Sequence, residues 1–364
     1  MYIDKIEVIN FRNYEELHLS LHEGTNIFYG NNAQGKTNIL ESAYLCGTTK
    51  SHRGSKDKDM IRFGEEEAHI RMSVVKQGIP YRIDMHLKKN RSKGIAVNEV
   101  PIKKASELFG IVNFVCFSPE DLNMVKNGPA ERRRFLNFEL CQINKLYMDD
   151  LAKYNKILEQ RNRTLKDMQF RADYQDMLDI WDEQILYFGK KIIRERNIFL
   201  EYLNEIVKDI HSHLTNGVEK IELIYEPDTK EENYEKSLRE ARERDMNLKS
   251  TTVGPHRDDF AIEVNGIDMR RFGSQGQQRT SALSIKLSEI EILKRKTKDT
   301  PILLLDDVMS ELDSSRQNYL LKSISHIQTL ITCTGLDEFI ENRFPINQVF
   351  EVMDGHVRER KQRS

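Results

Sequence analysis

The chain has 364 residues, a formal net charge of −2 at neutral pH and 31% charged side chains. This length leaves room for about two domains. The mean hydropathy of −0.62 is typical of a soluble globular protein, and no apolar run approaches the roughly 20 residues of a membrane span. The near-neutral charge excludes bulk basicity as an argument for nucleic-acid binding, so any such binding must depend on local patches. The N-terminus lacks the apolar core of a signal peptide, so we expect a cytoplasmic protein.

The first elements along the chain are short strands. Alternation of apolar and polar residues predicts strands at 3–11 and 17–21, and an apolar run follows at 26–29. Residues 68–98 predict three more alternating strands, as in an antiparallel sheet with one solvated face. The polar segment 48–59 and the hairpin tip 88–94 are both basic. We interpret both as solvated surface, and contact with the phosphates of DNA is the alternative.

A phosphate-binding loop follows the third strand. An apolar strand leads into it and a helical pattern at 38–45 leads out, as this motif requires. Glycines let the backbone N–H groups turn toward an anion, and the helix N-terminus adds partial positive charge. Lys36 would reach the β- and γ-phosphates, and the Thr37 hydroxyl would ligate Mg²⁺. The motif G-x-x-x-x-G-K-T spans Gly30, Asn31, Asn32, Ala33, Gln34, Gly35, Lys36 and Thr37.

The middle of the chain has a helical pattern. A buried strand is predicted at 111–117. From about 130 to 215 the chain has one glycine, no proline, and apolar residues at spacings of three and four. This pattern predicts an antiparallel hairpin of two long helices, each of at most about 35 residues and roughly 50 Å long. The elements predicted next are a strand at 221–225, a charged helix at 231–248, and a strand with a hairpin turn at 260–266.

Two segments near the C-terminus carry further chemistry. The apolar strand 301–305 ends in Asp306 and Asp307. An acidic residue at this position holds Mg²⁺ in P-loop NTPases, so Asp306 is the predicted metal ligand, and Asp307 could polarise the attacking water. Upstream, residues typical of anion binding open a helix at 276–297, although a plain N-cap with a glycine turn explains them equally well. These residues include Ser274, Gly276 and Gln277.

The order of these segments resembles the ATPase head of ABC proteins, with Walker A, signature, Walker B and D-loop in sequence. A helical insertion between the Walker motifs is similar to the SMC-like DNA-repair branch, and the RecF family in particular. The resemblance covers essentially the whole chain. It depends on F-R-N-Y at 11–14, S-P-E-D-L at 118–122, G-P-x-x-R-R-x-F-L at 128–136, V-G-P-H-R-D-D at 253–259, S-Q-G-Q-Q-R at 274–279 and L-L-L-D-D-V-x-S-E-L-D at 303–313.

The resemblance implies an α/β fold, an ABC-type head with a mixed sheet. Its parts would be 1–117 and 251–364, with a helical arm subdomain inserted at 118–250. It implies a protein that binds ATP and Mg²⁺, forms a homodimer on ATP, and binds gapped or junction DNA. Such a protein helps RecO and RecR to load RecA, and slow, DNA-stimulated hydrolysis releases it. No membrane partner is expected.

The resemblance also implies roles for single residues. Ser274 and Gly276 would contact the γ-phosphate held by the other subunit, and Asp313 would lie at the dimer seam. The implied ATP contacts are Gly30 through Thr37, together with Ser274, Gly276 and Gln277. The implied catalytic residues are Lys36, Asp306 and Asp307. The implied Mg²⁺ ligands are Thr37 and Asp306.

Three departures from the ABC pattern argue against fast hydrolysis. Gln275 stands where the signature usually has glycine, Asp307 replaces the usual glutamate, and Thr334 occupies the switch-histidine position. No glutamine loop can be placed. Two other functions remain open, namely a nuclease-linked or defence ATPase and an ABC transporter subunit. The chain has no added acidic nuclease-like cluster, and its helical hairpin and altered signature disfavour a transporter.

Several remaining residues have two interpretations. One or two of the arginines at 132–134 could face the nucleotide or DNA, because successive helical residues lie about 100° apart. The C-terminal cations Arg358, Arg360, Lys361 and Arg363 fit a frayed end at least as well as a binding tail. The four cysteines lie in apolar contexts without metal-binding spacing, so we expect them in the core.

Overall fold

The computed structural model describes residues 1–104, 107–168, 174–336 and 345–360. The chain forms two compact units. One, here called the sheet unit, comprises Met1–Asp121 and Lys286–Ser364, and the other, the arm unit, comprises Leu122–Ile285. No helix within the described ranges is both long and apolar enough to cross a membrane.

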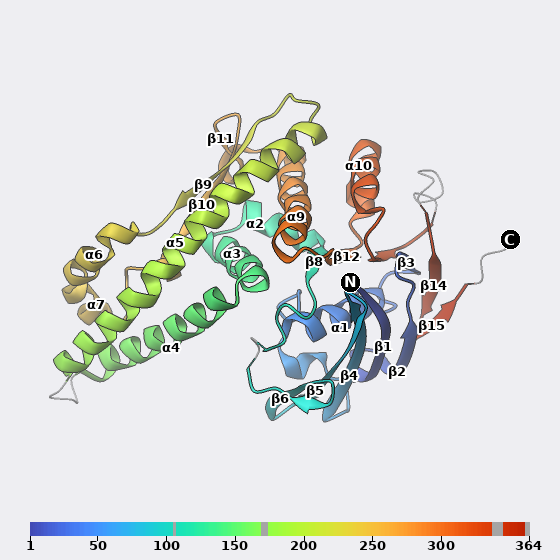
Figure 1. Cartoon of the computed structure of the whole chain (residues 1–364), viewed down its shortest axis with the longest axis horizontal. Helices are drawn as coiled ribbons and strands as arrows, with labels where there is room; N and C mark the ends of the chain where they lie inside the picture. The colour runs from blue at the N-terminus through green and yellow to red at the C-terminus, as the bar shows by residue number, and fades with distance from the viewer. Residues whose placement is uncertain (105–106, 169–173, 337–344, 361–364) are drawn as a thin grey trace. The chain divides into compact units, whose positions relative to one another are not determined.

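One of the two sheets of the sheet unit is a six-stranded mixed sheet, with β14 and β15 at the right of Figure 1. Five strands run parallel in the order β14-β3-β13-β12-β8, and β15 pairs antiparallel with β14 at the edge. The central strands are almost wholly buried apolar runs, as expected when helices or a second sheet cover both faces. The strands are β3 Thr25–Tyr29, β8 Phe114–Phe117, β12 Ile302–Asp306, β13 Thr329–Cys333, β14 Gln348–Met353 and β15 His356–Glu359.

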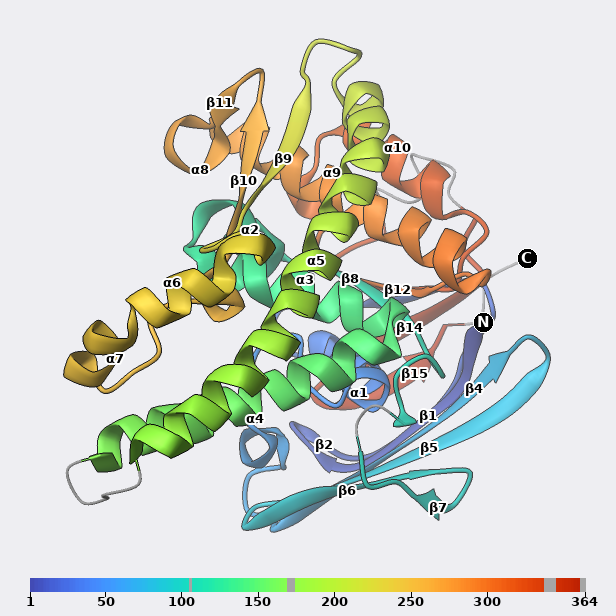
Figure 2. The same ribbon diagram turned by 60° about the vertical axis from the view of Figure 1, so that its left-hand side comes forward.

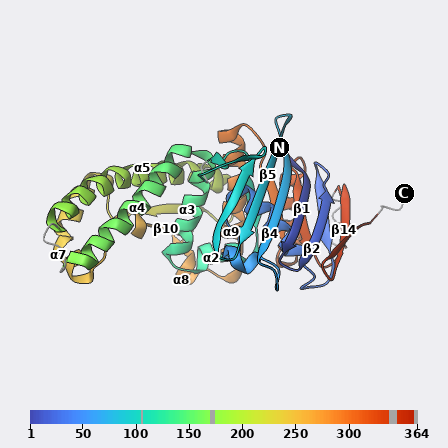
Figure 3. The same ribbon diagram turned by 90° about the horizontal axis from the view of Figure 1, so that it is seen from below.

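The second sheet of this unit is antiparallel, in the order β2-β1-β4-β5-β6-β7. Figure 2 shows it as a curved layer, and Figure 3 shows β5, β4, β1 and β2 side by side. Burial alternates along β4 and β5, so one face is buried and the other solvated, as predicted. The strands are β1 Tyr2–Phe11, β2 Tyr14–Ser20, β4 Glu67–Lys76, β5 Ile79–Lys88, β6 Arg91–Val97 and β7 Val100–Pro101.

Helix α1, Lys36–Thr48, packs against strands of both sheets. Its residues from Ile39 onward are buried all round, because the helix has a sheet on more than one side. The parallel strands β3, β12, β13 and β8 all have their carboxyl ends at one edge, and α1 begins there. The other helical segments of this unit are η1 Asp57–Met60, η3 Pro119–Asp121, η7 Met309–Glu311 and α10 Ser314–Ile324.

The arm unit is mainly helical, with α4 and α5 side by side (Figure 1). Helix α9 begins in this unit and ends in the sheet unit. The helices are α2 Leu122–Lys126, α3 Pro129–Ile143, α4 Lys145–Asp167, α5 Tyr174–Leu214, η5 Glu231–Asn233, α6 Tyr234–Glu240, α7 Arg242–Leu248, η6 Pro255–Arg257, α8 Met269–Phe272 and α9 Gln275–Thr297. A small antiparallel sheet has the order β11-β10-β9, from β9 Ile221–Glu226, β10 Asp259–Val264 and β11 Ile267–Asp268.

The predicted pair of helices of at most about 35 residues is wrong in two respects. Helix α5 has 41 residues. The first predicted helix is divided at Asn144, whose backbone is extended at φ −139° and ψ 100°. The Asn144 side chain accepts hydrogen bonds from the N–H groups of Leu146 and Tyr147 and so caps a new helix. Asparagine favours such caps, but apolar spacing alone does not reveal one.

The arm unit also extends beyond the expected boundary at residue 250. Strand β10 pairs with β9 along its whole length, from Asp259 opposite Glu226 to Val264 opposite Ile221. This pairing joins residues 259–264 to the arm unit, which continues to Ile285. The predicted turn at 265–266 is present, with both residues at positive φ, as in a type I′ hairpin. All four cysteines are buried and reduced, as predicted.

Candidate nucleotide-binding site

The loop between β3 and α1 requires its two glycines. Gly30 has φ +153°, and a Cβ there would lie 2.3 Å from the carbonyl oxygen of Val352. Gly35 has φ +109°, and a Cβ there would lie 2.5 Å from Nδ2 of Asn13. Both the conformation and the close approach of neighbouring atoms exclude larger residues. Between the glycines, Asn31, Asn32 and Ala33 are exposed, so this part of the loop is open to a ligand.

The turn between β1 and β2 braces the loop. Asn13 Nδ2 donates to the Gln34 carbonyl oxygen over 3.0 Å, and Asn38 Nδ2 donates to Asn13 Oδ1 over 2.8 Å. The buried Tyr14 hydroxyl donates to the Gly35 carbonyl oxygen over 3.0 Å. The sequence singled out F-R-N-Y at 11–14 only as a family pattern. Its local function is to fix the backbone of the phosphate-binding loop.

Lys36 is buried within the loop at 6% exposure. Its Nζ donates to the carbonyl oxygens of Gly30, at 2.6 Å, and Asn31, at 2.9 Å. Burial lowers the Lys36 pKa, and the nearby side chains of Asp307, Cys333 and Asp306 only partly oppose that effect. The Lys36 ammonium group therefore lies against the backbone of the phosphate-binding loop.

Asp306, at the end of β12, meets the start of α1. Its Oδ1 accepts hydrogen bonds from Thr37 Oγ1 at 2.7 Å and from Thr332 Oγ1 at 2.8 Å. Burial raises the Asp306 pKa, but the polar contacts of His52, Thr37 and Thr332 outweigh this effect, so the pKa is lowered overall. The structure thus joins the predicted metal ligands Thr37 and Asp306, which lie 269 residues apart in the chain.

This donor set fits Mg²⁺. The ion prefers oxygen ligands and commonly takes one or two from protein side chains, with the remainder from water and nucleotide phosphates. Within the described residues, no group of three or more His, Cys, Asp or Glu residues could hold a metal ion. The Thr37–Asp306 pair therefore fits a metal that arrives with a nucleotide. Asp307 follows in a left-handed conformation, φ 56°, and its N–H donates to Thr332 Oγ1 over 3.0 Å.

The signature segment opens helix α9 in the arm unit. Ser274 Oγ accepts from the Gln277 N–H over 3.2 Å, and Gln277 Oε1 accepts from the Ser274 N–H over 3.1 Å. This reciprocal pair is a capping box, so the N-cap interpretation is confirmed. Ser274, Gln275 and Gly276 remain exposed. Asp313 caps another helix, because its carboxylate accepts from the Arg316 N–H over 3.0 Å.

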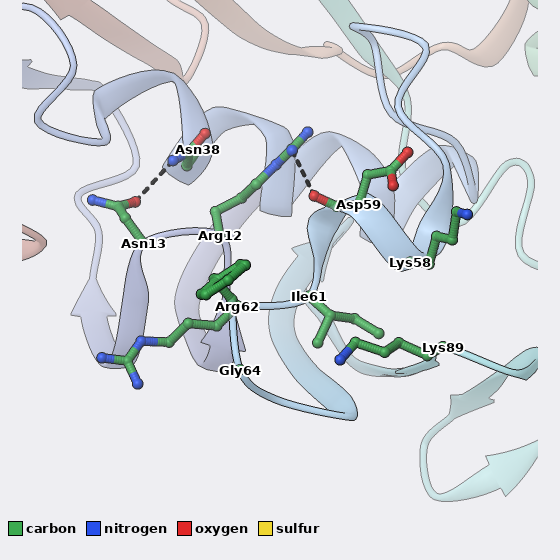
Figure 4. A pocket seen from close by; sticks show the side chains of 10 residues that line it. Arg12, Asn13, Asn38, Lys58, Asp59, Ile61, Arg62, Gly64 and Lys89 are labelled. Atoms are coloured by element: carbon green, nitrogen blue, oxygen red, sulfur yellow. Dashed lines mark hydrogen bonds between the residues drawn. The ribbon is translucent and has the colours of Figure 1, made fainter.

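An open cavity of about 820 Å³ is lined in part by Asn13, which donates a hydrogen bond to the loop residue Gln34 (Figure 4). Asn13 and Asn38, which hold the loop, line one part of it, and Arg12 donates to the Asp59 carbonyl oxygen over 2.8 Å in another part. A cavity of this volume is large enough for a nucleoside. Its lining is Arg12, Asn13, Asn38, Lys58, Asp59, Ile61, Arg62, Phe63, Gly64 and Lys89.

The basic hairpin tip has acidic partners. Lys88 lies 3.7 Å from Glu67, Lys89 lies 2.9 Å from Glu66, and Lys93 lies 2.8 Å from Asp57. These pairs lower the net positive charge of the tip and favour the solvated interpretation.

The arginines at 132–134 divide between internal contacts and the surface. Arg132 forms two hydrogen bonds to Asp259, of 2.6 and 2.8 Å, and Arg133 donates to the Asp258 carbonyl oxygen over 2.7 Å. Arg134 is half exposed. The first two therefore hold the arm unit together.

The described part of the C-terminal segment extends to residue 360. Arg358 lies in β15 opposite Glu351, and the Arg360 guanidinium lies 5.9 Å from the centre of the Tyr29 ring. The interpretation as a frayed end is therefore wrong for these two residues, because Arg358 lies in β15 and the Arg360 N–H donates to the Val349 carbonyl oxygen of β14 over 2.8 Å. Lys361 and Arg363 lie outside the described residues.

The fold and this site define a P-loop ATPase head of the SMC type. The family model of the RecF/RecN/SMC N-terminal domain matches residues 2–357. The chain is 61% identical over 357 residues to the DNA replication and repair protein RecF of Agathobacter rectalis, covering 98% of this chain and 99% of that protein. It is 58% identical over 359 residues to the RecF of Lachnospira eligens, with coverage of 98% and 99%.

Comparison with solved structures supports the same family and fold. A structure of the recombination mediator protein RecF with ATP superimposes with a TM-score of 0.92 at 38% identity, covering 99% of this chain and 98% of that one. The Smc head domain of Pyrococcus furiosus, at 16% identity and a TM-score of 0.57, covers 98% of this chain and 95% of that one and shows likeness of fold alone. The chain belongs to the RecF family. The predicted family and the mixed α/β ATPase head are therefore confirmed.

Proposed function

We propose that this protein is an ATP-dependent clamp of DNA replication and recombinational repair. In this proposal it dimerises around two ATP molecules, binds gapped or junction DNA, and acts with RecO and RecR to load RecA. Slow, DNA-stimulated hydrolysis then opens the clamp. The relatives named above as DNA replication and repair proteins, and a RecF–ATP structure described within the RecFOR pathway, support this proposal. The protein would act in the cytoplasm, where bacterial DNA is replicated.

The observation that carries the proposal is the hydrogen bond of 2.7 Å between Thr37 and Asp306. It joins the Walker A and Walker B segments into one oxygen-rich site beside a buried ammonium group. In the proposal the loop residues 30–37 bind the phosphates, and Lys36 stabilises their charge. Thr37 and Asp306 would hold Mg²⁺, which supplies charge neutralisation at the phosphates when bound. The cavity of Figure 4 would receive the nucleoside.

The exposed signature segment supports the second half of the site. A serine in a capping box accepts from a backbone N–H, but its own O–H remains able to donate. Ser274 therefore keeps one donor for an anion, next to the partial positive charge of the α9 N-terminus. In the proposed dimer this donor, with Gly276 and Gln277, meets the γ-phosphate bound by the other copy. Asp307 would orient the attacking water, and a carboxylate shorter than glutamate fits slow turnover.

Sedimentation velocity with a non-hydrolysable ATP analogue tests the clamp. The wild-type protein should change from monomer to dimer on addition of the analogue. Lys36→Ala should lose nucleotide binding and dimerisation, whereas Ser274→Arg should bind nucleotide but remain monomeric. Ser92→Arg, at the exposed tip of the β5–β6 hairpin, is the matched control and should dimerise. An oligomer that forms without nucleotide in both site variants would refute the model.

Gel shifts with gapped DNA test the DNA function. Binding should be tighter with the ATP analogue than without it, and tighter for gapped DNA than for an intact duplex. The affinity should fall as salt rises, because phosphate contacts release counterions. Equal affinity for both DNAs, or metal-dependent DNA cleavage, would contradict the proposal and favour a nuclease-linked ATPase.

A further inference from the structure

His52, whose side chain is almost inaccessible to solvent, lies beside the Walker B aspartate Asp306. We propose that His52 is a positioning residue, whose imidazole fixes the orientation in which Asp306, together with Thr37, binds the metal ion of the nucleotide. This inference rests on the proposed ATP and Mg²⁺ site and adds a residue to it. The histidine belongs to the polar segment 48–59, which the sequence interpreted as a solvated loop.

The two oxygens of Asp306 have different neighbours. Oδ1 accepts from the hydroxyls of Thr37 and Thr332, at 2.7 and 2.8 Å. Oδ2 lies 3.8 Å from His52 Nε2, in a pair whose side chains are 5% and 8% exposed. At this distance the imidazole nitrogen and the carboxylate oxygen are close neighbours. Rotation of the carboxylate would break the hydroxyl contacts and the imidazole contact together, so the three neighbours define one orientation.

His52 is itself held on both sides. Its ring packs edge-on against the ring of Tyr44, with centroids 5.5 Å apart and an interplanar angle of 77°. Before it, Ser51 Oγ donates to Glu41 Oε1 over 2.5 Å. Tyr44 and Glu41 both belong to α1, the helix that begins with Lys36 and Thr37. The metal ligand Thr37 and the support of His52 are therefore parts of one rigid element.

A second anchor follows His52 in the chain. Arg12 forms two hydrogen bonds of 2.8 Å to Glu41 and a third, of 2.6 Å, to Ser55 Oγ. Arg12 precedes Asn13 and Tyr14, which brace the phosphate-binding loop. One turn of the chain therefore fixes both the loop and the segment that carries His52. This continuity favours a positioning role over that of an isolated core histidine, because supporting contacts orient metal ligands.

Mn²⁺ binding measured by electron paramagnetic resonance, with the ATP analogue present, tests the role without measuring turnover. His52→Leu should weaken Mn²⁺ binding by about 10–100-fold, the usual cost of losing a residue that supports a metal ligand. Nucleotide binding in EDTA should stay unchanged, because that interaction does not depend on the metal. His52→Gln should retain most of the affinity, since its amide can donate to Oδ2, and the shorter His52→Asn should not.

A matched control comes from the antiparallel sheet. His69 Nε2 lies 3.5 Å from Asp84 Oδ1, a histidine–carboxylate contact outside the candidate site. His69→Leu should leave Mn²⁺ affinity at the wild-type value. If His52→Leu does not fold, as judged by circular dichroism, the Mn²⁺ affinities of His52→Gln and His52→Asn are compared instead. A higher affinity in the Gln variant would support the positioning role of His52.

Three outcomes would overturn the inference: wild-type Mn²⁺ affinity in His52→Leu, equal affinities in the Gln and Asn variants, or an equal loss in His69→Leu. A wild-type protein that binds no nucleotide would instead refute the proposed function itself. The two failures are therefore distinguishable.

Discussion

The arm unit and the candidate site in the sheet unit both contain buried polar networks, but the two differ in which groups remain available to a ligand. Arg196 and Asp258, exposed by only 2% and 0%, form an ion pair of 2.8 Å. Arg196 also donates to the Pro255 carbonyl oxygen over 2.6 Å, and the Tyr225 hydroxyl donates to Asp258 over 2.5 Å. In the arm unit, the charged groups of Arg196 and Asp258 are thus bonded to neighbouring protein groups. In the phosphate-binding loop, by contrast, Asn31, Asn32 and Ala33 are exposed to solvent.

This difference separates two motifs that are equally distinctive in the sequence. V-G-P-H-R-D-D at 253–259 supplies Asp258 and Asp259, which pair with Arg196 and Arg132 inside the arm unit. G-N-N-A-Q-G-K-T at 30–37 supplies an open loop. A conspicuous motif therefore indicates either a binding site or a structural centre, and burial distinguishes them, because a saturated buried network has no group left for a ligand.

The largest expected effect comes from Arg196→Leu. The substitution leaves Asp258 buried without its charged partner, so we expect the free energy of unfolding to fall by about 3–5 kcal/mol. Nucleotide affinity should stay unchanged below the unfolding temperature, because the phosphate-binding loop lies in the other unit. Urea denaturation and equilibrium nucleotide binding measure the two quantities.

Arg257→Ala is the control for this prediction, because Arg257 belongs to the same motif but is exposed. It should change the free energy of unfolding by less than about 0.5 kcal/mol. If Arg196→Leu were as stable as the wild type but lost nucleotide binding, the network would be functional and the comparison would fail.

Most of the sheet unit could be predicted because its elements carry strong local patterns. The continuous apolar run before Asp306 predicts a buried strand, and the alternation of apolar and polar residues along 68–98 predicts strands with one solvated face. The pairing of Thr37 with Asp306 was also predictable, since strand ends in P-loop proteins have known roles. His52 was not, because a single histidine in a polar loop has no pattern. Only the three-dimensional contact between segments reveals it.

The arm unit was harder to predict for two physical reasons. The helix break at Asn144 depends on a side-chain cap, which leaves the apolar spacing nearly continuous. The extent of the unit depends on β9 pairing with β10, a contact between residues over 30 positions apart. Similarly, the roles of Arg132 and Arg133 depend on carboxyl and carbonyl groups more than 120 residues away. The local sequence pattern therefore cannot predict the helix cap, the strand pairing or these arginine contacts.

We expect Glu41→Gln, in the sheet unit, to lower the free energy of unfolding by less than Arg196→Leu does in the arm unit. The effect of Glu41→Gln should also depend on pH. Burial raises the Glu41 pKa, but hydrogen bonds from Arg12 and Ser51 outweigh it and the pKa is lowered. A carboxylate with a depressed pKa contributes stability above its unfolded pKa of about 4.3, and that contribution is lost as pH falls through the folded pKa. The variant should be less stable at neutral pH by about 1–3 kcal/mol.

Urea denaturation of both proteins from neutral pH to below about pH 4 checks this prediction, since the difference should shrink only at the acidic end. Glu16→Gln, at an exposed position of β2, serves as control and should show little difference. A gap between wild type and Glu41→Gln that is constant across this range would show that the charge of Glu41 is not what holds the segment.

The smallest expected effect is that of Tyr14→Phe, which removes a single hydrogen bond to the Gly35 carbonyl oxygen. The ring stays buried, so the free energy of unfolding should fall by only about 0.5–1.5 kcal/mol. Nucleotide affinity should also fall, by less than about tenfold, because the loop loses one of its braces but keeps Asn13. Tyr81→Phe in β5 should leave nucleotide affinity unchanged. If both variants bind nucleotide equally well, Tyr14 stabilises the sheet unit without organising the loop, and the bracing role belongs to Asn13 alone.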